Sequence, residues 1–216
     1  MAKKVEWHDD YWLLLMQAYL QKPVGVKPLY SRVMVGLSME LHIAPQVLQA
    51  RMEQIARLDT PRIERYWKTY ASNPTSLARA VRLLREMKGF GAADEFYEGV
   101  EVQETFERDF RPLSEDERLT PAMLILILDL YFQLTPSTMV TQTPEVAELA
   151  RLLKLKANEV VQVLDIFQIC DPYLERNEVT FSPLLLPCQQ VWQRMVDKEP
   201  QQLHALAEEL KEYFRR

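Results

Sequence analysis

Histidine and cysteine, the side chains most often used for metal binding and nucleophilic catalysis, are scarce in this chain. There are three histidines, His8, His42 and His204, and two cysteines, Cys170 and Cys188. No histidine has a second histidine or a cysteine at the spacing of metal ligands. No histidine lies near Cys188 in the sequence to activate its thiol. The sequence therefore predicts no metal site, no cofactor and no catalytic residue.

Short motifs that bind nucleotides or activate a nucleophile are also absent from the sequence. The chain has 5 glycines and contains no GxSxG, no Walker-type loop and no dinucleotide-binding fingerprint. The acid pairs Asp9–Asp10 and Glu208–Glu209 are adjacent rather than helically spaced, and such pairs are usually solvated. We therefore expect a protein that is not an enzyme.

Proline positions and apolar spacing predict an all-α fold of about ten helices. Several of the 13 prolines follow Thr, Asn or Ser. Such a pair is typical of a helix start, because the polar side chain accepts a bond from the first turn and proline has no N–H to leave unpaired. The expected helices lie near 11–20, 31–42, 45–58, 61–71, 75–88, 121–134, 144–154, 157–169, 183–197 and 200–214.

A shift of 112 positions aligns the two halves of the chain. Tyr19 falls on Tyr131 and Asp59 on Asp171, and no gap is needed between residues 11 and 59. Two sets of amphipathic helices can align by periodicity alone, but the loop lengths agree as well, and we therefore expect a duplication. After an insertion in the second copy, Trp67, Pro74 and Leu77 match Trp192, Pro200 and Leu203.

Each half resembles a helix-turn-helix unit. In the second half, the segment 143–164 has small and apolar residues on the core side of its first helix, Leu155 in the turn, and Val160 and Leu164 on its second helix. The resemblance implies two helix-turn-helix-like halves, with at most a short wing-like hairpin near 175–182. The first half has the same pattern in Leu37, Leu41, Ile43, Leu48 and Met52.

The second half is also similar to the helical region that precedes the nuclease domain in some bacterial HNH endonucleases. The residues that carry this similarity are 128–132, 144–146 and 171–172. HNH chemistry requires a histidine-rich metal site, and no such site follows in this sequence. The similarity therefore implies nothing about cleavage.

Charge is unevenly distributed along the chain, whose net charge is −5. Residues 1–90 carry 14 Lys and Arg against 8 Asp and Glu, whereas residues 91–216 carry 12 against 23. The predicted division is a basic first repeat (1–90), an acidic connector with interspersed aromatics (91–118) and an acidic second repeat (119–216). The acids of the connector would lie in water, or would cover the basic stripe 79–88.

In helix-turn-helix families the second helix enters the major groove, and its outward side chains contact bases and phosphates. By analogy, the first half predicts a DNA-associated regulatory role. Further basic residues on this half are Arg62, Arg65, Lys68, Arg79 and Lys88. The candidate contacts with duplex DNA are Lys27, Arg32, Gln46, Gln49, Arg57, Arg82 and Arg85.

The alternative is a protein-interaction or scaffold module that keeps the fold without binding DNA. The second half carries Glu159 and Asp165 where phosphates would lie, so it suits a protein partner or self-association better. A net charge of −5 also disfavours DNA, because affinity depends on neutralising phosphates.

The sequence also predicts where the protein resides. It begins with a charged segment rather than a signal peptide. The most apolar stretch, 122–134, is interrupted by Asp129 and is too short for a membrane span. Two cysteines are too few for a disulfide framework. We therefore expect a cytoplasmic protein without a membrane partner.

Overall fold

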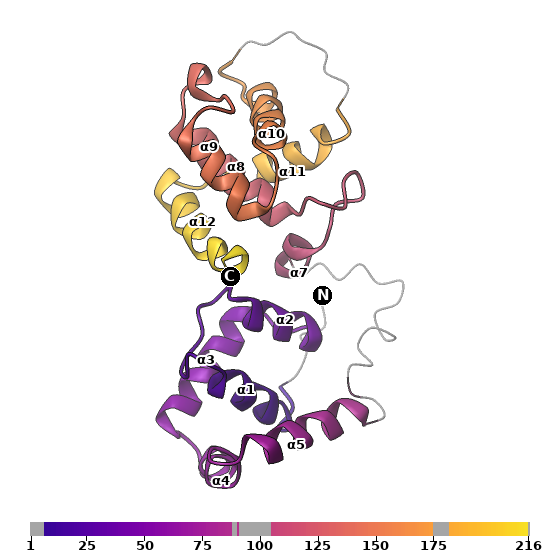
Figure 1. Cartoon of the computed structure of the whole chain (residues 1–216), viewed down its shortest axis with the longest axis vertical. Helices are drawn as coiled ribbons and strands as arrows, with labels where there is room; N and C mark the ends of the chain where they lie inside the picture. Colours follow the sequence, from indigo (N-terminus) through magenta and orange to yellow (C-terminus); the bar gives the residue numbers. More distant parts are fainter. Residues whose placement is uncertain (1–6, 88–89, 91–104, 175–181, 216) are drawn as a thin grey trace. The chain divides into compact units, whose positions relative to one another are not determined.

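The computed structural model describes residues 7–87, 90, 105–174 and 182–215 (Figure 1). Within these ranges it has eleven α-helices, one short 3-10 helix and no strand. This confirms the predicted all-α fold class. Residues 175–181, where a wing-like hairpin was expected, lie outside the described residues. No described helix has the length and apolar character needed to cross a membrane.

The chain divides into two compact units, residues 1–107 (unit 1) and 108–216 (unit 2). Most of the predicted acidic connector, residues 91–104, lies outside the described residues. The division into 1–90, 91–118 and 119–216 therefore stays a prediction, as does the covering of the stripe 79–88 by connector acids.

Unit 1 is built around its first helix. Helix α1 contacts α2, α3 and α5, and α4 contacts α5. Five of the ten residues of α1 are buried, because its sequence is apolar on several sides. The helices are α1 (Tyr11–Leu20), α2 (Arg32–Leu41), α3 (Pro45–Arg57), α4 (Pro61–Tyr70) and α5 (Pro74–Glu86).

Unit 2 is likewise built around one helix, α8, which contacts α9, α10, α11 and α12. Its residues 124–131 are all buried, so neighbouring helices surround it on every side. Helix α7 (Thr105–Phe110) contains the boundary between the units. The other elements are α8 (Pro121–Gln133), η1 (Pro136–Thr138), α9 (Pro144–Leu153), α10 (Ala157–Cys170), α11 (Leu185–Met195) and α12 (Pro200–Phe214).

The proline-led helix starts follow the expected chemistry at three sites. The side-chain oxygens of Thr60, Asn73 and Thr120 accept bonds of 3.0–3.3 Å from N–H groups in the first turns of α4, α5 and α8. Thr143 instead donates its hydroxyl to the carbonyl of Thr138 at 2.5 Å, although α9 still begins at Pro144. After Ser182 the chain first makes a turn, and α11 begins at Leu185 rather than at Pro183.

The turns that join α2 to α3 and α9 to α10 share an unusual backbone. His42 and Lys154, which stand 112 positions apart, have left-handed φ values of 53° and 59°. In each turn the next amide donates to a carbonyl five residues earlier, at 3.2 and 2.9 Å. Helices α2 and α9 also begin and end 112 positions apart. The predicted repeat requires such spacing, but the similarity of the two halves as a whole stays a prediction.

The left-handed turn at Lys154 gives a stability prediction. We expect Lys154→Gly to be more stable than Lys154→Ala by about 1 kcal/mol, because glycine has no Cβ to clash in this region of φ/ψ space. Both variants lose the same charge, so the comparison isolates the Cβ. Urea unfolding of the two variants measures the difference, and equal stabilities would contradict a left-handed conformation at residue 154.

Candidate interaction surfaces

Helix α3 is the second helix of the predicted helix-turn-helix unit in unit 1. Its outward face exposes Gln46, Ala50, Glu53 and Arg57, which follow one another at helical spacing. This face carries one acid and one base, so it offers no net positive charge to phosphates. The opposite face packs into the core through Pro45, Leu48, Met52 and Ile55.

Three of the predicted DNA contacts, Lys27, Gln46 and Gln49, form bonds inside unit 1. Lys27 is 6% exposed, and its ammonium donates to the carbonyl oxygens of Gln21, at 2.5 Å, and Pro23. Burial lowers the pKa of Lys27. The side-chain amide of Gln49 donates to the carbonyl of Lys27 at 3.4 Å. Gln46 donates to the hydroxyl of Tyr30 at 3.3 Å. These side chains hold the loop before α2 against α3.

The other predicted contacts are four arginines on the surface of unit 1. Arg32 is exposed in the first turn of α2. Arg85, which is 47% exposed, forms a two-pronged ion pair with Glu40, with N–O distances of 2.6 and 2.8 Å. The hydrogen bond to Glu40 raises the pKa of the Arg85 guanidinium. Three of the arginines thus have an acid neighbour: Asp59 for Arg57 at 3.2 Å, Glu86 for Arg82 at 3.6 Å, and Glu40 for Arg85.

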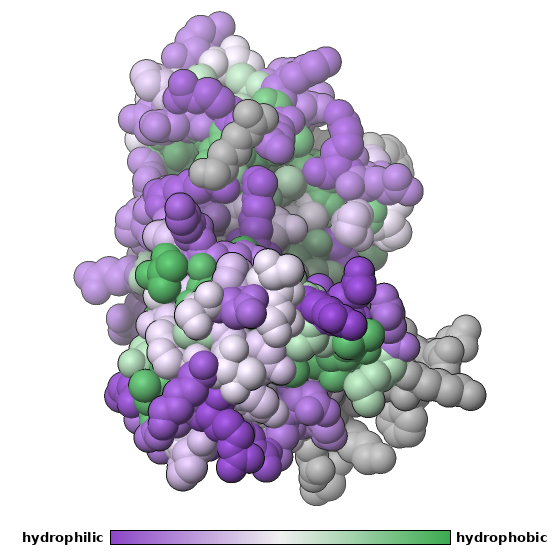
Figure 2. All heavy atoms as spheres, turned by 60° about the horizontal axis from the view of Figure 1, so that its bottom comes forward, coloured by the Kyte–Doolittle hydropathy of each residue, from purple (hydrophilic) through white to green (hydrophobic). Residues whose placement is uncertain are grey.

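Helices α4 and α5 form the basic surface of unit 1, called here the α4–α5 surface. They carry six Lys and Arg against two Glu. Arg65 and Arg79 are exposed and form no ion pair with any residue that the structure describes. Figure 2 brings this end of unit 1 forward, where hydrophilic side chains are interspersed with small apolar patches. The basic residues are Arg62, Arg65, Lys68, Arg79, Arg82 and Arg85.

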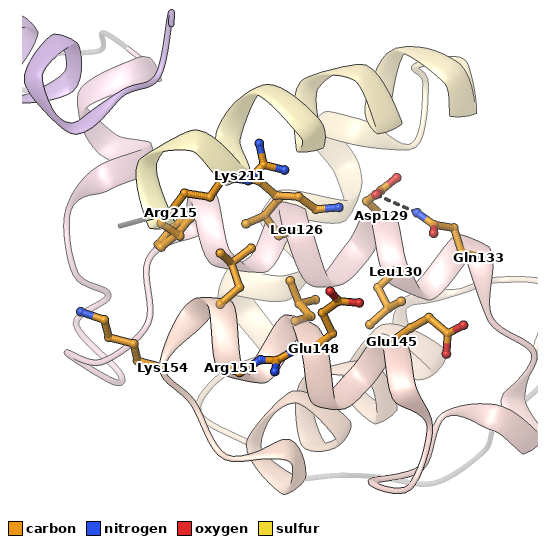
Figure 3. A pocket seen from close by; sticks show the side chains of 13 residues that line it. Leu126, Asp129, Leu130, Gln133, Glu145, Glu148, Arg151, Lys154, Lys211 and Arg215 are labelled. Atoms are coloured by element: carbon orange, nitrogen blue, oxygen red, sulfur yellow. Dashed lines mark hydrogen bonds between the residues drawn. The ribbon is translucent and has the colours of Figure 1, made fainter. Parts of the chain in front are cut away.

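Unit 2 contains a groove of about 920 Å³ between α8, α9 and α12, called here the unit-2 groove (Figure 3). Its floor is apolar and its rim is charged. The floor consists of Leu126, Leu130, Leu149, Leu152 and Phe214. The rim carries the acids Asp129, Glu145 and Glu148 and the bases Arg151, Lys154, Lys211 and Arg215.

The charges of the unit-2 groove are sorted along its length. Figure 3 shows Asp129 and Glu145 toward one end and Arg151, Lys154 and Arg215 toward the other. Four exposed rim residues form no ion pair within the described part of the chain: Glu145, Glu148, Arg151 and Lys154. These four charges, all carried by α9 and the residue after it, are available to a partner.

The acidic end of the groove is fixed by a buried carboxylate. Asp129 of α8 is 5% exposed, and its Oδ2 lies 3.1 Å from Nδ1 of His204 on α12. The side-chain amide of Gln133 donates to the same oxygen at 2.8 Å. A carboxylate removed from water needs such partners, because an unpaired buried charge is costly. The contact with His204 therefore ties α12 to α8.

Unit 1 has a smaller groove of about 340 Å³ at the corresponding place, between α1, α2 and α5. A shift of 112 positions places Leu14, Gln17, Ala18 and Gln21 on Leu126, Asp129, Leu130 and Gln133. The same shift places Val33, Gly36, Leu37 and Glu40 on Glu145, Glu148, Leu149 and Leu152. After the insertion, the shift of 126 that aligns Pro74 with Pro200 and Leu77 with Leu203 places Arg85 on Lys211.

One substitution separates the two grooves. In unit 1, Glu40 binds Arg85 across the groove. In unit 2, Leu152 stands where Glu40 would, and Lys211 instead pairs with Glu208 on its own helix at 2.5 Å. The unit-1 groove is therefore spanned by an ion pair, and the unit-2 groove is left open.

Two of the predicted DNA contacts, Arg32 and Arg85, line the unit-1 groove, but none of them lines the unit-2 groove. The sequence prediction included no residue of α9, the first helix of the motif in unit 2. The sequence does indicate that the four unpaired rim charges face outward, because they alternate with the core positions of one predicted helix. The four residues are Glu145, Glu148, Arg151 and Lys154. Their availability could not be read from the sequence, because it depends on α12, which follows more than 45 residues later.

Among the residues that the structure describes, no group of three or more His, Cys, Asp or Glu is arranged to hold a metal ion. Burial raises the pKa of Cys170 to about 11 and that of Cys188 to about 12, so both thiols are protonated at neutral pH and are weak nucleophiles. His42 is buried with its Nδ1 2.9 Å from Oε1 of Glu107, also in unit 1.

No protein-family model, curated protein or solved structure matches this chain. Proposals about its function therefore depend on the grooves and charges described above.

The ion pair across the unit-1 groove gives a second prediction. In a double-mutant cycle of Glu40→Gln and Arg85→Gln, we expect a coupling energy of about 0.5–1 kcal/mol, because the pair is two-pronged but about half exposed. Urea unfolding at low salt measures the coupling, which should shrink at high salt because ions screen an exposed pair. Strictly additive single effects would contradict an ion pair between these side chains.

Proposed function

We propose that the protein is a non-enzymatic interaction module that binds a protein segment in the unit-2 groove. The observation that carries the proposal is an open groove with an apolar floor and four exposed, unpaired charges on its rim. An amphipathic helix laid in an apolar groove is a common mode of protein recognition. The floor supplies the free energy of binding, and rim charges of both signs select the partner and its direction.

The state of the predicted DNA contacts supports this proposal over DNA binding by α3. Lys27 is bonded within the loop before α2, Gln49 of α3 is bonded to that loop, and Arg57 and Arg85 have acids beside them. A phosphate would have to displace these partners, at a free-energy cost that an unpaired arginine does not incur. The outward face of α3 therefore lacks the free cations from which DNA affinity arises.

Site-specific photo-crosslinking tests the interaction proposal. We expect a photoreactive amino acid at Leu152, on the groove floor, to give a discrete protein adduct in cells, and mass spectrometry identifies the adduct. The control carries the same probe at Gln162, an exposed position of α10 that does not line the groove. Equal, diffuse labelling from both positions, or no protein adduct at 152, would contradict the proposal.

A second candidate function is the DNA-associated regulatory role, carried by the α4–α5 surface of unit 1. The observation that favours it is the pair Arg65 and Arg79, which are exposed and lack an ion-pair partner within the described residues. Phosphates attract such arginines without first displacing an acid. In this proposal, Arg82 and Arg85 would add phosphate contacts to those of Arg65 and Arg79. Helix α3 would contribute little to DNA binding.

Salt titration of DNA binding by the full chain tests the second candidate. It predicts that duplex DNA binds at low salt and that log affinity falls linearly with log salt. The Arg65→Gln/Arg79→Gln variant should reduce that slope by about 2, because roughly one counterion is released for each phosphate contact. The control Arg57→Gln removes an arginine already paired with Asp59 and should leave the slope nearly unchanged. A folded chain that does not bind at low salt contradicts this candidate.

A further inference from the structure

We propose that the occupant of the unit-2 groove is helix α9 of a second copy of this chain, lying antiparallel to α9 itself. The inference deepens the proposed interaction function and rests on it. The charge pattern of α9 identifies the partner. When a second α9 runs in the opposite direction, its bases come level with the acids of the first.

The four unpaired charges are the basis of the pairing. Glu145 and Glu148 lie in the first half of α9, whereas Arg151 and Lys154 lie at its end. In an antiparallel pair centred between residues 149 and 150, position 145 lies level with 154 of the other copy along the helix axes, and position 148 lies level with 151. Each acid is thus level with a base, and two-fold symmetry forms every such pair twice. Such an interface buries the same surface on both copies.

The polarity of the groove agrees with this direction. The incoming α9 brings its acidic first turn to the basic end, near Arg151, Lys154 and Arg215 (Figure 3). Its basic last turn then reaches the acidic end, near Asp129 and Glu145. The two helix dipoles also run antiparallel, which places opposite partial charges side by side.

The face of α9 that lines the groove also has apolar contacts to offer. Val146, Leu149, Ala150 and Leu153 are buried in unit 2, whereas Leu152 is half-buried on the groove floor and Ala147 is exposed. Leu152 can add apolar contact in the paired state. Burial of Leu152 supplies free energy that exposed ion pairs alone lack.

The corresponding helix of unit 1 does not have this pattern. At the positions of Glu145 and Glu148, helix α2 carries Val33 and Gly36, and Glu40 is already bound to Arg85. Two antiparallel copies of α2 would therefore not bring an acid of one copy next to an unpaired base of the other. The inference concerns unit 2 alone.

Two charge-reversed forms of the full chain test the pairing. The first is Glu145→Lys/Glu148→Lys, and the second is Arg151→Glu/Lys154→Glu. In a symmetric antiparallel pair, each variant alone faces like charges, and we expect its self-association to weaken by at least about tenfold relative to the native chain. Mixed in equal amounts, the two variants should form a heterodimer. Sedimentation velocity measures the association, and circular dichroism checks that each variant is folded.

A fourfold variant separates loss of pairing from damage to the helix. Carrying all four reversals, the chain is again complementary to its own reverse, and we expect it to regain self-association. The matched control Glu53→Lys/Glu209→Lys changes the net charge as much as the first variant, at exposed positions outside the groove. It should associate like the native chain.

The outcomes distinguish this inference from the proposed function. A native chain that stays monomeric at all concentrations overturns the inference, as does a native dimer that both twofold variants preserve. If the probe at Leu152 then yields an adduct with a different protein, the proposed interaction function is supported. The proposal that a second copy of the chain occupies the groove is rejected. If neither self-association nor a protein adduct at 152 is found, both proposals fail.

Discussion

Each unit depends on the burial of one helix that is apolar on most of its surface. Residues 124–131 of α8 are all buried, and such a helix cannot present any side to water without a large loss of hydrophobic free energy. Helices α9 to α12 must therefore surround it. The unit-2 groove lies between two of these helices, α9 and α12, and α8 contributes to its floor. Leu126 and Leu130 of α8 form part of its apolar floor, which Leu149 and Leu152 of α9 and Phe214 of α12 complete.

Much of the fold could be predicted from the sequence, because its local determinants act within a few residues. Proline after Thr60, Asn73 or Thr120 starts a helix by capping chemistry that is complete within one turn. The start at Pro183 was placed two residues early, because the side chain of Ser182 bonds the amide of Leu184 in a turn before α11 begins. Helix boundaries are predicted poorly where a polar side chain can form hydrogen bonds with the backbone in more than one way.

The candidate sites could be predicted less well, because residue type does not reveal whether a charge is available. Lys27 looks like a phosphate contact in the sequence, yet its ammonium is bonded to two carbonyls of its own loop. Arg85 and Lys211 hold corresponding positions and differ in what stands across the groove from them. The partner of Arg85 is Glu40, which lies 45 residues away along the chain, and helical spacing does not indicate such a contact.

The difference between the two grooves concerns specificity more than stability. A half-exposed ion pair such as that between Glu40 and Arg85 contributes at most about 1 kcal/mol, so unit 1 would fold nearly as well without it. What the pair does is occupy the groove with charges that satisfy each other and attract no partner. Replacing the acid by Leu152 in unit 2 leaves the groove open and its floor more apolar. A single position can thus decide which of two corresponding surfaces is able to bind.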